Sequence, residues 1–173
     1  RAEFAMSRRL SVATRLVVSA WSAVLLLTAC DDGDEPPVAP TQQATTSSAA
    51  RDPDAYAAEL FTLTNEARIA HGQGPLSESS CARTAALKRA AALVDEEELE
   101  HASLAPVIRA CEPLTTAAEN LVNSSAGAAE VIDAWLDSAG HRANMLDPEL
   151  TELGVGCVHD DDTLLCSQVF LGP

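Results

Sequence analysis

Two short segments constrain the possible folds of this chain more than any other feature. Residues 135–144 read Trp-Leu-Asp-Ser-Ala-Gly-His-Arg-Ala-Asn, and Glu119 and Asn120 precede them, with Glu119 sixteen residues before the tryptophan. Each segment places a carboxylate or an imidazole beside residues suited to packing, and neither fits a common catalytic pattern. Because residues so far apart in sequence meet only through tertiary structure, these segments require a fold that joins them.

The N-terminal residues have the organisation of an export signal. Arg8, Arg9 and Arg15 form a basic region, and residues 16–29 form a run of 14 uncharged, mostly apolar residues. The run is shorter than the roughly 20 residues that a membrane-spanning helix needs, which favours a signal peptide. Residues 1–5 precede Met6 and resemble an expression scar or a misplaced start.

The apolar run ends in Leu-Thr-Ala-Cys at Cys30, which resembles the lipobox of bacterial lipoproteins. We therefore expect cleavage before Cys30 and its acylation; the alternative is an ordinary signal peptide with a chance cysteine. The residues that follow are rich in Asp, Pro, Thr, Ser and Ala, a composition typical of a disordered linker. The expected organisation is a signal peptide over 1–29, the lipidated cysteine and linker over 30–51, and one domain over 52–173.

The charge of the mature chain excludes one class of partner. Residues 1–29 carry a net charge of +3, so their removal leaves −18 on the remainder. A chain this acidic is repelled by nucleic acid, and we expect no nucleic-acid partner. We expect a monomer outside the cytoplasm, held by its lipid anchor on a bacterial cell membrane.

Four cysteines remain after the lipidated one, namely Cys81, Cys111, Cys157 and Cys166. In an exported chain they predict two disulfides, for which three connectivities exist. Their spacing lacks the paired Cys-x-x-Cys clusters of zinc fingers. Three aspartates at 160–162 indicate a hairpin turn, which places Cys157 opposite Cys166. The predicted pairs are Cys157–Cys166 and, by elimination, Cys81–Cys111.

The apolar spacing predicts an α+β domain of about 120 residues, large enough for one core. Asp52 followed by Pro53 indicates the start of a first helix, which ends near Gly72. Further helices are predicted after Ser79 or Ser80, around 106–110, and after Ser124 or Ser125. Strands are predicted over 119–122, 153–158 and 164–170, forming a small antiparallel sheet.

Several spaced motifs occur in one order over about residues 54–171. They are Asn65 and Arg68, Gly74-Pro75-Leu76, His101, Glu119-Asn120, the segment 135–144 with Trp135, Gly140, His141, Arg142 and Asn144, and the closing strands at 153–156 and 168–170. Together they resemble the bacterial SCP-like branch of the CAP superfamily (cysteine-rich secretory proteins, antigen 5 and pathogenesis-related proteins). The resemblance implies a three-layer α-β-α sandwich around the small sheet.

The resemblance also implies a cleft lined by His101, Glu119 and His141. Asn120, Ser138, Arg142 and Asn144 would support that cleft. Animal members usually carry a second glutamate three residues after the tryptophan, where this chain has Ser138. That departure weakens any function that needs two carboxylates.

Three roles remain open for His101, Glu119 and His141. They could hold the structure together through buried hydrogen bonds, bind zinc or another divalent cation weakly, or perform acid/base chemistry with Glu119. The expected function is binding of a small apolar or cell-envelope ligand in this cleft. The alternative is a metal-assisted hydrolase of envelope material, with the histidines as ligands and Glu119 as base or third ligand.

Other conspicuous residues have simpler interpretations. Asn65 and Arg68 are expected to hold loops together, and Trp135 to lie in the core. His159 beside three aspartates is expected in a solvated turn, and the acidic run 95–100 on an exposed surface. No serine lies in a nucleophile-elbow pattern, and no glycine-rich phosphate loop is present, so the sequence gives little support to a serine hydrolase or a nucleotide-binding protein.

Overall fold

The computed structural model describes residues 51–173. The predicted signal peptide, Cys30 and nearly all of the predicted linker lie outside this range. None of the helices within it is long and apolar enough to cross a membrane. The elements are α1 (Pro53–Ala70), β1 (Ser77–Glu78), α2 (Ser80–Ala91), α3 (Ala105–Ala110), β2 (Thr116–Ser124), α4 (Ala128–Asp137), α5 (Ala139–Leu146), β3 (Glu152–Asp160) and β4 (Thr163–Gly172).

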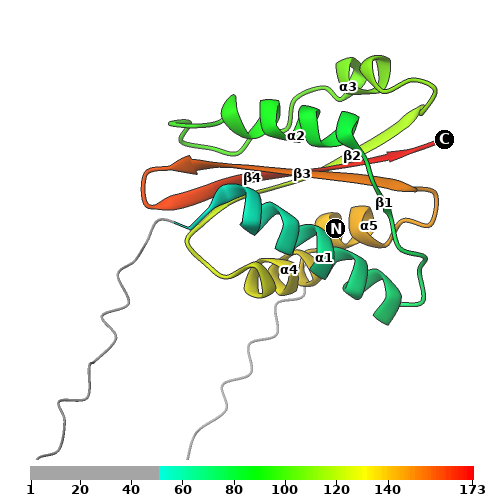
Figure 1. Cartoon of the computed structure of the whole chain (residues 1–173), viewed down its shortest axis with the longest axis horizontal. Helices are drawn as coiled ribbons and strands as arrows, with labels where there is room; N and C mark the ends of the chain where they lie inside the picture. Colours follow the sequence, from blue (N-terminus) through cyan, green and yellow to red (C-terminus); the bar gives the residue numbers. More distant parts are fainter. Residues whose placement is uncertain (1–50) are drawn as a thin grey trace, which may run out of the picture. The chain divides into compact units, whose positions relative to one another are not determined.

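The domain is a three-layer sandwich around one four-stranded sheet of order β1-β3-β4-β2. Figure 1 shows α2 and α3 on one side of the sheet and α1, α4 and α5 on the other. The predicted fold class is therefore confirmed. The sheet is mixed, because β1 runs parallel to β3 while the other pairs are antiparallel. Sequence patterning missed β1 because its two residues are both exposed and too few to alternate.

Two predicted helix starts are confirmed by their capping hydrogen bonds. Oδ1 of Asp52 accepts the N–H groups of Asp54 and Ala55 at 2.8 and 3.0 Å, which satisfies two free donors of α1. The hydroxyl of Ser79 accepts the N–H of Ala82 at 3.3 Å and caps α2.

The predicted start of the next major helix is wrong. α4 begins after Gly127, whose N–H donates to Oε2 of Glu130 at 2.9 Å, and Ser124 and Ser125 lie before it. The Ser124 hydroxyl instead accepts the N–H of Ala126 at 3.0 Å and so organises the preceding turn. A serine side chain bonds nearby backbone equally well in a turn and at a cap, so its presence alone does not mark a helix start.

Helix α2 packs on the sheet through very small side chains. Ala82, Ala86 and Ala90 recur every four residues and are fully buried. Across from them lie Gly154 and Gly156 of β3, where an added Cβ would come within 2.0 Å of Arg83 N and 2.4 Å of Leu87 N respectively. The backbones of helix and strand therefore approach too closely for any side chain at the two glycines.

Both predicted disulfides are present. Cys157 and Cys166 are direct partners on β3 and β4, with Cα atoms 4.1 Å apart. Cys81 in α2 joins Cys111 at the end of α3 across a Cα–Cα distance of 5.8 Å. The second bond fastens the short helix α3 to the outer side of α2.

Candidate functional site

Glu119 supplies the carboxylate of the predicted site, and it is buried. Its side chain is 1% exposed and projects from β2 toward α2. Oε1 accepts from Ser167 Oγ at 2.9 Å and from Arg89 Nε at 3.0 Å. Oε2 lies 2.9 Å from His101 Nδ1 and 3.4 Å from Arg89 Nη2. Both carboxylate oxygens are therefore engaged by groups from α2, from β4 and from the loop before α3.

Arg89 is the member of this site that sequence reasoning missed. It belongs to α2 and pairs with Glu119 through two nitrogens, and its Nη2 also donates to the carbonyl of Glu100 at 3.1 Å. The same guanidinium thus neutralises the buried carboxylate and fixes the loop that carries His101. Nothing local distinguishes Arg89 from an ordinary helix-surface arginine, because its partner lies 30 residues away.

Asn120 points to the opposite side of the sheet from Glu119. Its Nδ2 donates to Gln168 Oε1 at 3.0 Å and to the His141 carbonyl at 3.3 Å. Asn144 donates from Nδ2 to Asn120 Oδ1 at 2.9 Å and to the Glu119 carbonyl at 3.1 Å. Gln168 in turn donates to Thr64 Oγ1 at 2.6 Å. These amides, of which Asn120 and Gln168 are fully buried, tie α1, α5, β2 and β4 together, which is a structural role.

His141 lies at a different cavity from His101. Its half-buried ring stands 6.4 Å from the ring of Trp135, centroid to centroid. Trp135 is buried, as expected, and donates from Nε1 to the Leu121 carbonyl at 3.2 Å. We call the adjoining cavity of about 420 Å³ the His141 groove. It is lined by Leu99, Leu121, Val122, Asn123, Ser124, Ala126, Glu130, Val131, Ala134, Trp135, Ser138 and His141.

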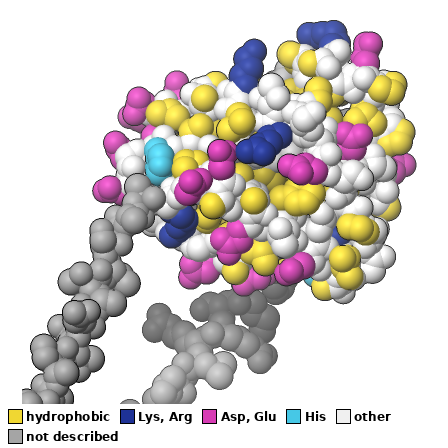
Figure 2. All heavy atoms as spheres, in the orientation of Figure 1, with side chains coloured by type: hydrophobic (Ala, Val, Ile, Leu, Met, Phe, Trp, Pro, Cys, Tyr) yellow, Lys and Arg dark blue, Asp and Glu magenta, His cyan; other side chains and the backbone are white. Residues whose placement is uncertain are grey.

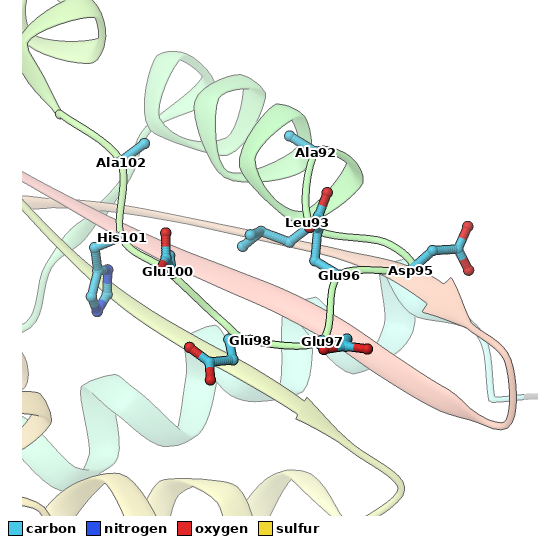
Figure 3. Close-up of a pocket in the computed structure, with 9 residues that line it drawn as sticks. All are labelled: Ala92, Leu93, Asp95, Glu96, Glu97, Glu98, Glu100, His101 and Ala102. Carbon is cyan, nitrogen blue, oxygen red and sulfur yellow. The ribbon is translucent and has the colours of Figure 1, made fainter.

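The imidazole of His101 instead borders the acidic loop between α2 and α3. Its side chain is 53% exposed, and it lines a cavity of about 730 Å³ together with the carboxylates of residues 95–98 and Glu100. Figure 3 shows these acidic side chains pointing in different directions along the loop. The structure therefore brings Glu119 and His101 into contact, and His141, which lines the His141 groove, lies near enough to His101 for their charges to interact.

The residues present do not fit the zinc or other divalent-cation site that the ligand types of His101, Glu119 and His141 left open. Within residues 51–173, no three side chains of His, Cys, Asp or Glu come together as a metal ion requires. Arg89 already supplies the positive charge beside Glu119. Ser138, at the position of the second carboxylate, lies between α4 and α5 and accepts the Arg142 N–H on its carbonyl at 2.8 Å.

Asn65 and Arg68 hold loops together, as expected. Asn65 exchanges two hydrogen bonds with the backbone of Leu76, at 2.7 and 3.1 Å. The guanidinium of Arg68 is almost fully buried and donates to the carbonyls of Gly74, Met145 and Asp147 at 2.7 to 2.9 Å. The Asn-x-x-Arg motif therefore fixes the loops after α1 and α5.

His141 makes the domain sensitive to acid. Burial lowers its pKa below the ordinary 6.5, and the neighbouring positive charge of His101 lowers that pKa further. As the pH falls, His141 is therefore protonated in the unfolded chain before it is protonated in the folded one. The contribution of neutral His141 to the free energy of unfolding is complete above about pH 6.5 and declines as the pH falls toward the lowered pKa. We expect the melting temperature to decline over this range less in His141→Gln than in the wild type.

An NMR titration of the His141 ring protons measures this pKa directly. His101→Gln removes the neighbouring charge, so it should raise the His141 pKa toward 6.5 without reaching it, because the burial remains. A His141 pKa at or above 6.5 in the wild type contradicts the prediction.

Comparison with known proteins agrees with this architecture. The chain is 30% identical over 136 residues to YkwD, an uncharacterized protein of Bacillus subtilis (strain 168). The match covers 74% of this chain and 51% of YkwD, so the chain spans about half the length of that curated relative.

Solved structures share the fold. One is an extracellular protein of Bacillus anthracis (strain Ames) that contains an SCP domain, with a TM-score of 0.62, 23% identity, and coverage of 80% of this chain and 45% of that one. Another is an outer surface protein of Borrelia burgdorferi, with a TM-score of 0.64, 16% identity, and coverage of 70% of this chain and 96% of that one. The model of the cysteine-rich secretory protein family, CAP, matches residues 61–170. The chain therefore belongs to the CAP family of cysteine-rich secretory proteins.

Proposed function

We propose that this domain binds a small apolar or cell-envelope ligand in the His141 groove. The observation that carries the proposal is the lining of the groove, in which apolar side chains such as Leu121, Val131 and Trp135 accompany a few polar ones. Its volume of about 420 Å³ lies within the range of small-molecule pockets. His141 and Ser138 supply hydrogen-bonding groups that orient a ligand along the apolar wall.

The hydrolase alternative finds less support. A general base needs a free acceptor within reach of the proton that it removes. Both oxygens of Glu119 are engaged by Arg89, Ser167 and His101, and His141 lines the His141 groove, to which Glu119 does not contribute. A metal-bound water has no ligand set among the described residues. Binding without turnover therefore agrees better with the geometry.

Trp135 provides a direct test of ligand binding. The chain has two tryptophans, so Trp21→Phe in the full chain leaves Trp135 as the single tryptophan, whose emission can be excited selectively. We expect octanol, decanol or a soluble peptidoglycan fragment to change its emission saturably. Ala134→Arg, at an exposed position lining the groove, should weaken binding by roughly tenfold or more by filling the ligand space.

Ala143→Arg is the matched control, because Ala143 is also an exposed helical alanine but does not line the groove. It should leave the affinity unchanged. Equal loss in both variants, or no saturable signal with any of these probes, refutes binding at the His141 groove.

We further propose that residues 1–29 are a signal peptide and that the domain is displayed outside the cytoplasm by a lipid on Cys30. The lipobox-like sequence, the two disulfides and the surface or extracellular character of the similar B. anthracis and B. burgdorferi proteins support this location. Intact-mass analysis of the membrane fraction should show loss of residues 1–29 and added acyl mass. Cys30→Ser should release the protein from the membrane; unchanged retention and mass contradict the proposal.

A further inference from the structure

A second apolar groove runs between α2 and α3, and it shares no lining residue with the His141 groove. We call it the α2–α3 groove; it encloses about 640 Å³. Buried Val107 and Cys111 belong to its lining and pack with core residues of α2 and β4. The full lining is Ser80, Cys81, Thr84, Ala85, Lys88, Arg89, Ala92, Ala102, Ser103, Pro106, Val107, Ala110 and Cys111.

The length and the lining of this groove suit a single alkyl chain. It follows α2 from Ser80 to Ala92, a length of about 18 Å at 1.5 Å per helical residue. None of the lining residues is aromatic, and many are alanine, so the domain's own side chains leave the space open. The disulfide Cys81–Cys111 holds α3 against α2, which keeps both walls in place.

The basic residues in the groove favour a ligand with a negative charge. Two basic residues line it, and Arg89 is already paired with Glu119. Lys88 is exposed and forms no ion pair among residues 51–173. It is the single lysine of a chain with net charge −15, and acidic side chains are scattered over the face seen in Figure 2. An anionic group is therefore attracted to Lys88 and repelled by much of the remaining surface.

We propose that the α2–α3 groove binds a single-chain amphiphile with a carboxylate head, such as a medium-chain fatty carboxylate. The alkyl chain lies over Val107 and the alanines, where it buries apolar area at about 25 cal/mol per Å². The carboxylate faces the ammonium group of Lys88. This site differs from the His141 groove in position and in charge selection, so each can fail without the other.

Calorimetric titration of the full chain with decanoate, decanol and decyltrimethylammonium, each below its micellar concentration, tests the proposal. We expect decanoate to bind most tightly and the cationic amphiphile least tightly. High salt should reduce the preference for decanoate over decanol, because Lys88 is exposed and its charge is screened. Equal affinity for the three probes overturns the assignment of the carboxylate head.

Matched variants separate the apolar part from the charge. Ala110→Trp fills the groove and should abolish binding of decanoate. In an Ala134→Arg background, which closes the His141 groove, it should abolish binding of decanol as well, whereas Ala105→Trp, on the same helix but outside the lining, should do neither. Lys88→Gln should weaken decanoate binding by roughly threefold to fivefold, as expected for an exposed ion pair, and leave decanol unchanged. Lys88→Arg should restore most of the affinity, and Arg109→Gln, which removes an exposed cation outside the groove, should have no effect.

The single lysine also gives a footprint that is independent of calorimetry. Bound decanoate should slow acetylation of the Lys88 amine, read by peptide mass, and decanol should slow it less. Decanoate binding that survives Ala110→Trp, or Lys88 acetylation that decanoate does not slow, would overturn the proposal. Ala134→Arg, which blocks the His141 groove, should leave decanoate binding at Lys88 intact.

Discussion

Gly154→Ala is expected to destabilise the domain by roughly 3 kcal/mol or more, or to prevent folding. The new Cβ would lie 2.0 Å from the backbone nitrogen of Arg83 and 2.3 Å from the carbonyl carbon of Ala82. Those atoms belong to the backbone of α2, so no side-chain rotation relieves the clash, and the helix has to move off the sheet. Gly156→Ala should have a similar effect, because its Cβ would meet the backbone of Leu87. Chemical denaturation measures both losses.

Gly140→Ala is the control for this prediction. A Cβ at Gly140 meets nothing within 4 Å, and the residue lies in the first turn of α5. Alanine there should be neutral or slightly stabilising, since it favours the helix more than glycine does. If Gly154→Ala and Gly140→Ala have the same denaturation midpoint, close packing of α2 on β3 does not govern stability.

Arg89→Met is expected to cost about 3–5 kcal/mol. It removes the cation from a carboxylate that is 1% exposed and leaves that charge with only Ser167 and His101 as hydrogen-bonding partners. The Arg89 side chain is itself only 16% exposed, so solvent screens the pair weakly. The same change releases the Glu100 carbonyl, so hydrogen exchange should also rise in the loop before His101.

A second substitution shows whether the charge or the packing is responsible. Glu119→Gln removes the buried charge, so the double variant Arg89→Met/Glu119→Gln should be more stable than Arg89→Met alone. Additive losses in the double variant contradict a direct coupling between Arg89 and Glu119 and assign the effect to the lost arginine stem.

Much of the fold is predictable because its signals are local. The Asp52-Pro53 pair starts α1, Ser79 starts α2, and the three aspartates mark the turn that aligns Cys157 with Cys166. The error at α4 arose where two local signals compete, since Glu130 marks the helix start while Ser124 engages the turn before it. Strand β1 offers no signal, because it forms only where its backbone meets β3.

The candidate site was harder to predict because it depends on which face each side chain takes. Glu119 and Asn120 are adjacent in sequence, yet they point to opposite sides of the sheet, as alternation along a strand requires. Family motifs locate Glu119, His101 and His141 but not the arginine that occupies the space beside the carboxylate. Only the register of α2 on the sheet shows that Arg89 reaches Glu119.

The partners of Arg68 bear on how such a domain can change over generations. Its guanidinium donates hydrogen bonds to the main-chain oxygens of Gly74, Met145 and Asp147, and every residue type carries such an oxygen. Mutations that exchange the side chains of those loops therefore preserve these hydrogen bonds, provided that the backbone keeps its path. Arg68 itself must therefore be retained, while the side chains of the loops around it can be substituted and can form new surfaces.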